Sequence, residues 1–239
     1  MPSKSTTEGI LVRLAAMAVL LAMPWCGARA SGTVEPAQAA ATALRQMCTR
    51  DVLQASAPAN MRLADIPNLN PAVTSVARTT GGVAYVPADA FADGAPEYCI
   101  VTGTVVTNPV SGKIANFGAA LPAPAAWTGR LLMQGCGGTC GDVFDNGPPD
   151  ASIVRRGYAV WTTDDGHVDS GYIASGAPIV ADSSWAVNAA GRPATDAIID
   201  YAHRAVHVVA SSGKAFTQRL YGASAIRHSY FLGCSDGGR

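Results

Sequence analysis

Runs of apolar and β-branched residues, separated by glycine and proline, recur along the chain and predict a series of β-strands. The clearest run, residues 97–106, is rich in valine, isoleucine and threonine. The five-residue run 130–134 leads into a glycine-rich loop and is predicted to be a central strand. The predicted strands are residues 97–106, 114–121, 130–134, 154–161 and 229–232.

Helical periodicity is clearest between Asp196 and about Leu220, which predicts a long amphipathic helix with an interruption at Gly213. The apolar positions that recur with this period are Ile198, Ala202, Val206 and Val209. His203 and His207 share a face of this helix, as a metal-binding pair would. Because Arg204 follows His203, the H-E-x-x-H pattern is missing, and we expect two solvent-facing histidines instead.

The first 30 residues have the pattern of an export signal, with basic residues before the apolar run 14–23 and small residues ending at Ala30. We expect cleavage after Ala30 and a secreted or periplasmic protein. An uncleaved membrane anchor is the alternative, but about 10 apolar residues fall short of the roughly 20 that a spanning helix needs. Cys26 also suggests a lipoprotein, although the residues before it are not the small ones that such a site requires.

Composition separates an N-terminal arm from a main domain. Residues 31–92 are rich in alanine and proline, with a short helix predicted over 37–50, and we expect them to pack on a catalytic domain formed by residues 93–239. Apolar residues make up 49% of the 239, which is enough for a buried core. The 17 basic and 17 acidic residues balance, so the totals give no indication of nucleic-acid or membrane binding and favour a small partner.

The cysteines add a structural constraint. Cleavage after Ala30 removes Cys26 from the six, leaving the odd set Cys48, Cys99, Cys136, Cys140 and Cys234. In an exported chain we expect Cys48 and Cys99 to join the arm to the sheet, the alternative being two free buried thiols. Cys136 and Cys140 have C-x3-C spacing and predict a local disulfide rather than a zinc site, because no second ligand pair accompanies them. Cys234 is then left without its partner.

The candidate chemistry lies at the end of the chain. Gly233 to Gly237 fits G-x-S-x-G, the sharp strand-to-helix turn that exposes a nucleophilic serine, here Ser235, above an α/β-hydrolase sheet. The loop 135–141 follows an earlier strand, where such folds place half of the oxyanion hole. Polar residues 162–167 end another strand, where open α/β sheets gather ligand-facing groups. His167 precedes the serine, so we interpret it as a structural loop brace rather than the base.

Several separated segments resemble the tannase and feruloyl esterase family, which includes the terephthalate monoester hydrolases. They are residues 127–130, 135–141, 157–159, 163–167, 221–222 and 229–239, and the resemblance begins at about Cys48. It implies an α/β class and an α/β-hydrolase fold, of which this chain is the N-terminal part, without the lid and the C-terminal half of the sheet. It also implies no cofactor in this chain, and a structural calcium, where there is one, in the lid.

The resemblance implies roles for particular residues. Ser235 is the nucleophile, and the backbone N–H groups of Asp236 and Gly138 are the oxyanion donors. Cys234 pairs with a cysteine beside the catalytic histidine, and both that histidine and the acid lie beyond Arg239. Family members vary at the position of Asp236, and Cys136 and Cys140 have no family role. We therefore expect the 239 residues alone to be inactive.

The sequence thus favours a serine carboxylesterase for esters of aromatic acids such as gallate or ferulate, acting through an acyl-enzyme. The alternative from another class is a non-catalytic exported remnant or binding protein built on a truncated hydrolase. A lipase or peptidase with the same elbow is disfavoured by the Cys234–Ser235 pair, which is specific to the resemblance.

Overall fold

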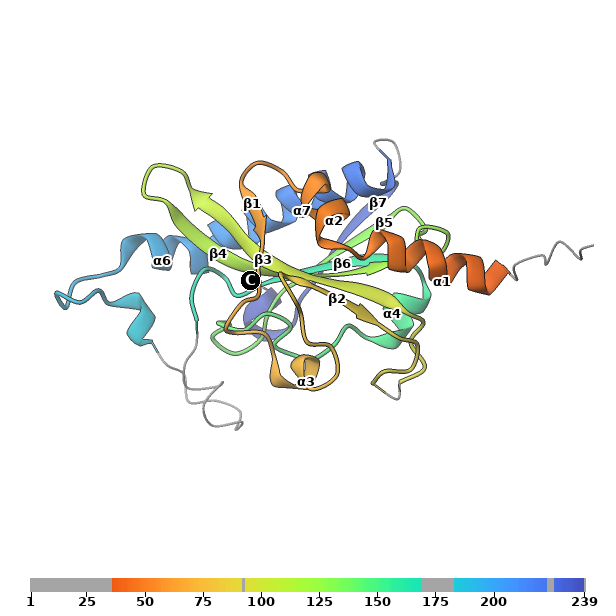
Figure 1. Ribbon diagram of the computed structural model, residues 1–239. Helices are drawn as coiled ribbons and strands as arrows, with labels where there is room; N and C mark the ends of the chain where they lie inside the picture. Colours follow the sequence, from red (N-terminus) through yellow and green to blue (C-terminus); the bar gives the residue numbers. More distant parts are fainter. Residues whose placement is uncertain (1–35, 92, 169–182, 223–225, 239) are drawn as a thin grey trace, which may run out of the picture. The chain divides into compact units, whose positions relative to one another are not determined.

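A mixed β-sheet of seven strands forms the centre of the computed structural model, which describes residues 36–91, 93–168, 183–222 and 226–238 (Figure 1). The order across the sheet is β1-β3-β4-β6-β5-β7, and β2 also pairs with β3. The strands are β1 (Met61–Leu63), β2 (Val83–Val86), β3 (Tyr98–Asn108), β4 (Lys113–Pro122), β5 (Arg130–Gln134), β6 (Tyr158–Thr163) and β7 (His228–Leu232).

Strand direction brings the candidate chemistry to one end of the sheet. The strands β1 to β4 run antiparallel to their neighbours, and β4 pairs antiparallel with β6. In contrast, β5 lies between β6 and β7 and is parallel to both. The carboxyl ends of β5, β6 and β7 therefore lie at the same end of the sheet, and the loops that follow these three strands are neighbours.

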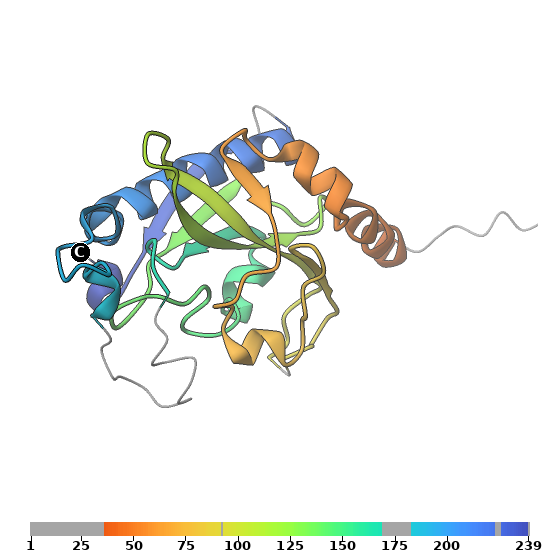
Figure 2. The same ribbon diagram turned by 60° about the vertical axis from the view of Figure 1, so that its left-hand side comes forward.

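Helices cover both faces of the sheet. They are α1 (Pro36–Met47), α2 (Arg50–Ser56), α3 (Pro71–Thr74), α4 (Ala151–Arg155), α6 (Thr195–Ile199), α7 (Ala205–Tyr221), the π-turn η2 (Asp200–Arg204) and the 3₁₀ turns η1 (Ser184–Ala186) and η3 (Ser235–Gly238). Figures 1 and 2 show α1, α2 and α7 along one face and α3 and α4 along the other. None of the described helices is long and apolar enough to span a membrane.

Strand alternation divides the core into two layers. On β6, Trp161 packs with the cluster of α1, α2 and α7, whereas its neighbour Val160 packs with that of α3 and α4. On β3, Val101 packs with the cluster of α1, α2 and α7, and its neighbour Ile100 packs with that of α3 and α4. A sheet covered on both faces explains why the sequence of β3 reads as a continuous apolar run instead of an alternating one.

The predicted arm contributes directly to this sheet. Its short strands β1 and β2 both pair with β3, and the expected helix over 37–50 is divided between α1 and α2. The arm and the sheet are also joined by the disulfide between Cys48 and Cys99. The predicted signal, residues 1–30, lies outside the described residues.

Two local predictions were wrong. Val154 and Arg155 belong to α4, because the Asp150 side chain accepts a hydrogen bond from Ser152 N and starts a helix there. The second error concerns the long helix, which continues through Gly213 and changes to a π-turn at Asp200–Arg204 instead.

Gly213 has a packing role in α7. A Cβ at this position would lie 2.6 Å from the Trp161 ring, which is fully buried. We predict that Gly213→Ala lowers the free energy of unfolding by about 1–2 kcal/mol, because overpacking outweighs the gain of about 1 kcal/mol in helix propensity. Urea unfolding measures this change. Ser211→Ala, on the exposed side of α7, is the control and should leave stability nearly unchanged. A more stable Gly213→Ala variant would contradict this packing role.

Candidate active site

Ser235 lies three residues after the end of β7, in a sharply turned backbone. Its φ is +55°, in the left-handed region that a non-glycine residue rarely adopts. The turn leaves no room for side chains beside it, since a Cβ on Gly233 would lie 1.7 Å from the Gly237 carbonyl oxygen. The two glycines of G-x-S-x-G are therefore required by close backbone contact, and Ser235 is exposed between them.

The serine turn packs against the glycine-rich loop that follows β5. Gly135 N donates to Leu232 O at 2.9 Å, which extends the β5–β7 pairing by one hydrogen bond. A Cβ on Gly237 would lie 2.4 Å from the Cys136 carbonyl oxygen, so the two backbones touch. The structure thus brings together the two segments that carry Ser235 and Gly138, although these segments are far apart in the sequence.

Gly138 occupies the tip of a tight turn. Cys140 N donates to Gly137 O at 2.9 Å, and a disulfide between Cys136 and Cys140 closes the same turn. Because a trans peptide points its C=O and N–H in opposite directions, an inward Gly137 carbonyl directs the Gly138 N–H out of the turn. A Cβ at Gly138 would meet no heavy atom within 4 Å, so this residue borders open space.

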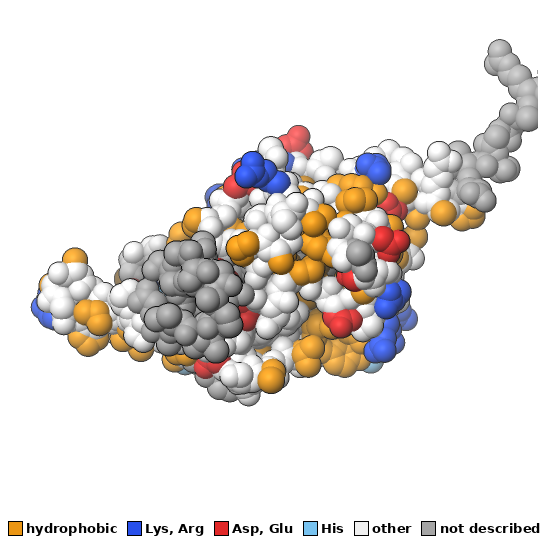
Figure 3. All heavy atoms as spheres, turned by 90° about the horizontal axis from the view of Figure 1, so that it is seen from below, with side chains coloured by type: hydrophobic (Ala, Val, Ile, Leu, Met, Phe, Trp, Pro, Cys, Tyr) orange, Lys and Arg blue, Asp and Glu red, His pale blue; other side chains and the backbone are white. Residues whose placement is uncertain are grey.

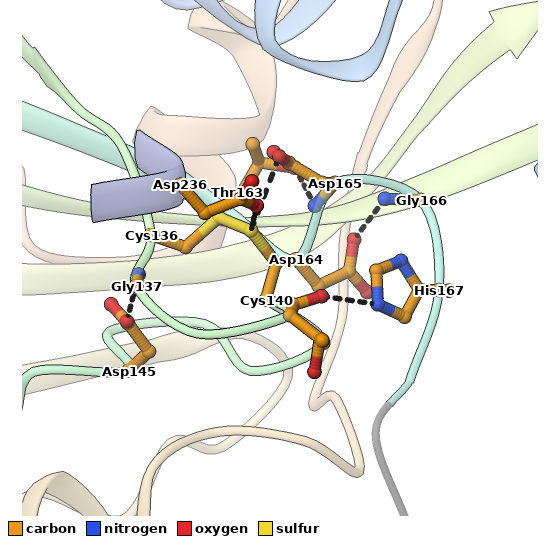
Figure 4. Close-up of a disulfide and its surroundings, with 12 residues drawn as sticks. Cys136, Gly137, Cys140, Asp145, Thr163, Asp164, Asp165, Gly166, His167 and Asp236 are labelled. Atoms are coloured by element: carbon orange, nitrogen blue, oxygen red, sulfur yellow. Dashed lines mark hydrogen bonds between the residues drawn. A yellow bond between two sulfur atoms is a disulfide. The ribbon is translucent and has the colours of Figure 1, made fainter. Parts of the chain in front are cut away.

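Buried and half-buried side chains hold this loop in place. Asp145 accepts a hydrogen bond from Gly137 N, and the His167 Nε2 lies 2.8 Å from Thr139 O (Figure 4). Asn68 Nδ2 donates to Gly141 O at 2.8 Å. Asp145 and Asn68 were not predicted, because neither belongs to a local motif.

Asp164 is the centre of a buried polar network beside the loop. Its carboxylate accepts hydrogen bonds from Asn68 Nδ2, Asn116 N, Asn116 Nδ2 and Gly166 N at 2.7–3.0 Å. Burial raises the pKa of Asp164 to about 6, against the opposing effect of these hydrogen bonds. Burial also raises the pKa of Asp145. Asp164 therefore acts structurally, connecting β4 and β6 to the segment before α3.

The polar end of β6 differs from the prediction of ligand-facing groups. Asp164, Asp165 and His167 are only 1%, 2% and 6% exposed. His167 stacks on Trp185, with ring centroids 4.0 Å apart, and meets Tyr201 edge-on at 5.5 Å. These contacts, with the Thr139 hydrogen bond, place His167 in the loop-bracing role that its position before Ser235 suggested.

The sulfurs of the loop also lie near carboxylates. Cys136, Cys140 and Asp165 offer ligand atoms within 4.8 Å of one another, and Asp236 Oδ2 lies 3.4 Å from Cys140 Sγ. Zinc binds cysteine as the thiolate, whereas the Cys136 and Cys140 sulfurs are joined to each other in a disulfide and are not thiolates. The oxidised loop is thus stiffened by a disulfide and does not present a zinc site at these residues.

The remaining candidate residues are placed as follows. Cys234 is exposed and is a free cysteine. Asp236 is half-buried beside the Cys136–Cys140 disulfide. His203 and His207 are both exposed on the helix, as expected.

Known proteins resemble the chain in both sequence and structure. A profile described as tannase and feruloyl esterase matches residues 99–239. Mono(2-hydroxyethyl) terephthalate hydrolase of Piscinibacter sakaiensis is 31% identical over 159 residues, which are 64% of this chain and 25% of that protein. An uncharacterised esterase of Xanthomonas campestris is 32% identical over 203 residues, which are 82% of this chain and 31% of that protein. Tannin acyl hydrolase from Aspergillus niger superposes with a TM-score of 0.55 at 22% identity, covering 82% of this chain and 33% of that chain.

The structural likeness defines a mixed α/β fold of the tannase type. Because the profile match covers more than half of its residues, the chain belongs to the tannase and feruloyl esterase family. The chain spans about a third or less of the length of these relatives. Their names all describe ester hydrolysis, which is the general chemistry associated with the family.

Proposed function

We propose that this chain carries the nucleophile and the oxyanion hole of an exported serine carboxylesterase that hydrolyses esters of aromatic acids. The observation that carries the proposal is the backbone of Ser235, held at a φ of +55° between two closely packed glycines at the end of β7. A strained, exposed serine at the end of a parallel strand is the geometry of a nucleophile elbow. The neighbouring turn with an outward Gly138 N–H supports the same function.

The proposed reaction has two steps. The Ser235 Oγ attacks the ester carbonyl while a histidine accepts its proton, and the histidine passes that proton to the departing alcohol as the acyl-enzyme forms. The same histidine then takes a proton from water, which attacks the acyl-enzyme, and returns the proton to Ser235 Oγ as the aromatic acid leaves. The Gly138 and Asp236 N–H groups would stabilise the oxyanion in both steps, each donor lowering the barrier by on the order of 3 kcal/mol.

The base is not assigned to any histidine of this chain. The four histidines, His167, His203, His207 and His228, all precede Ser235, and in this fold the catalytic histidine follows the serine. We propose that the 239-residue polypeptide by itself is therefore inactive. The histidine, the acid and the partner of Cys234 are proposed to follow Arg239.

The substrate class is inferred from the relatives. Two of them are named as hydrolases of a terephthalate ester and of tannin, and the description of the family adds feruloyl esters. The balance of charges agrees with a small substrate rather than a nucleic acid, and acidic and basic side chains both occur on the face shown in Figure 3. We propose no cofactor for this chain, and a structural calcium only in a lid of the kind that the family resemblance implies.

A panel of esters tests this function. The product of the full reading frame that contains this chain is assayed on methyl gallate, methyl ferulate and mono(2-hydroxyethyl) terephthalate. Methyl cyclohexanecarboxylate is the non-aromatic control. We predict that kcat/KM for at least one aromatic ester exceeds that of the control by on the order of 10-fold or more. The 239-residue polypeptide should show no turnover. Equal rates on cyclohexane and aromatic esters would contradict the substrate class, and turnover by the 239 residues alone would contradict their inactivity.

A further inference from the structure

We infer that His167 and Asp145 are positioning residues that hold the Gly138 N–H in the orientation of an oxyanion donor. This inference rests on the proposed function, because Gly138 is an oxyanion donor only in an acyl-transfer enzyme. Neither side chain reaches Ser235 in the hydrogen bonds of the described residues, so both act through the loop backbone.

The two side chains act on the residues that flank Gly138. Asp145 accepts the N–H of Gly137, the residue before it, and His167 holds the carbonyl of Thr139, the residue after it. Figure 4 shows the two side chains on opposite sides of the Cys136–Cys140 disulfide. Fixing a backbone group on each side of Gly138 restricts rotation of the peptide that carries its N–H.

The ring of His167 is itself held in place. Because Thr139 O can only accept, the Nε2 atom must carry the proton that is donated. Trp185 stacks on one face of the ring and Tyr201 meets it edge-on, which fixes the ring plane. The side chain is 6% exposed, so water does not compete freely for Thr139 O. Both aromatic partners come from the segment before α7, which includes the π-turn.

Asp145 supplies a charged acceptor at the other side. A hydrogen bond to an ionised group is stronger than a neutral one and holds its donor more firmly. Burial raises the pKa of Asp145, while the hydrogen bonds from Gly137 and Asn146 act in the opposite direction. Asn70 Nδ2 donates to Asp145 O at 2.9 Å, which anchors the backbone of the residue as well.

An oxyanion hole requires preorganised donors, because such donors need no reorganisation when negative charge develops on the carbonyl oxygen. A glycine at φ +55° with open space around it would otherwise be among the most mobile residues of the site. The disulfide limits the separation of the turn ends but does not fix the peptide at its tip. The side chains of His167 and Asp145 supply that restraint.

The test uses variants that separate hydrogen bonding from packing. His167→Phe keeps an aromatic ring against Trp185 and removes the N–H donor, whereas His167→Gln keeps a donor and loses the stacking. Asp145→Ala removes the acceptor, and Asp145→Asn retains a neutral one. In the active full-frame product, we expect His167→Phe and Asp145→Ala to lower kcat about 10- to 100-fold with little change in KM. His167→Gln and Asp145→Asn should recover part of the loss.

A thionoester distinguishes donor geometry from general damage. Wild-type enzyme should strongly prefer methyl ferulate to its thionoester, because the donors are placed for a carbonyl oxygen. That preference should shrink in His167→Phe and Asp145→Ala. Loss of rate with an unchanged ester-to-thionoester ratio would show a merely structural role and would overturn the inference.

Hydrogen exchange decides the question in the 239-residue chain without any need for activity. The amides of Cys140 and Gly141, which donate to Gly137 O and Asp164 O, should exchange about 10-fold faster or more in His167→Phe and Asp145→Ala, while those of β3 and β4 stay unchanged and report an intact fold. Unchanged exchange in the loop would overturn the inference even if esterase activity is found. Failure of the proposed function is seen separately, as turnover that does not depend on Ser235.

Discussion

Replacing Ser235 by alanine is expected to lower kcat for aromatic esters about a million-fold in the full-frame product, the loss that follows removal of the nucleophile from a serine hydrolase. Without Oγ no acyl-enzyme forms, and only binding and the oxyanion donors still favour attack by water. These leave a rate on the order of 10³-fold or more above the uncatalysed reaction. Steady-state kinetics measures the loss, and mass spectrometry of an organophosphonate adduct at Ser235 in the wild type identifies the attacked residue.

Ser229→Ala is the matched control for this substitution. Ser229 lies on the same exposed strand, β7, but in regular extended backbone rather than in the left-handed turn. Its replacement should leave kcat unchanged. A Ser235→Ala enzyme that keeps a tenth of the wild-type rate, as an order of magnitude, would remove the serine mechanism from consideration.

Much of the sheet could be predicted because β-branched runs identify buried strands without any tertiary information. The run 130–134 coincides with β5, and 97–106 lies almost wholly within β3. The strands β1 and β2 were missed. They have only three and four residues, and their partner β3 is distant in sequence, so no local pattern identifies them.

The buried face of the long helix shows where the apolar periodicity of a sequence predicts burial wrongly. The predicted stripe included Ile198 and Ala202, which are exposed, as well as the buried Val209. In the structure the buried positions of α7 are Ala205, Val209, Ser212, Gly213, Phe216 and Thr217. The π-turn before α7 shifts the register of the exposed and buried positions, and no signal in the apolar pattern marks it.

The candidate site, too, could be predicted from the sequence only in part. The motif around Ser235 could be recognised because its glycines are dictated by local backbone geometry. Its supports could not, since Asn68, Asn116 and Asp164 meet only after three distant segments fold together. An isolated asparagine gives no sequence signal of burial, whereas His167 could be interpreted as a brace from its position before the serine.

Removing the disulfide between Cys48 and Cys99 is expected to have the largest effect on stability. These cysteines are 51 residues apart, so the chain-entropy relation gives a loss of about 4 kcal/mol in the free energy of unfolding for Cys48→Ala/Cys99→Ala. The bond joins the end of α1 to the fully buried start of β3, and its loss frees the arm in the unfolded ensemble. Urea unfolding without added oxidant or reductant measures the change in the free energy of unfolding.

The second disulfide provides the control for this prediction. Cys136 and Cys140 are only 4 residues apart, and the same relation gives about 2 kcal/mol for Cys136→Ala/Cys140→Ala. Cys99, Cys136 and Cys140 are buried and Cys48 is half-buried, so each pair of alanines leaves a cavity. The first pair should therefore cost about twice as much as the second, about 4 against 2 kcal/mol. Equal losses would mean that native packing, and not the closed loop of chain, determines what each bond contributes. In the second pair, faster exchange of the Gly138 loop at nearly preserved global stability would instead show that this bond serves the site more than the fold.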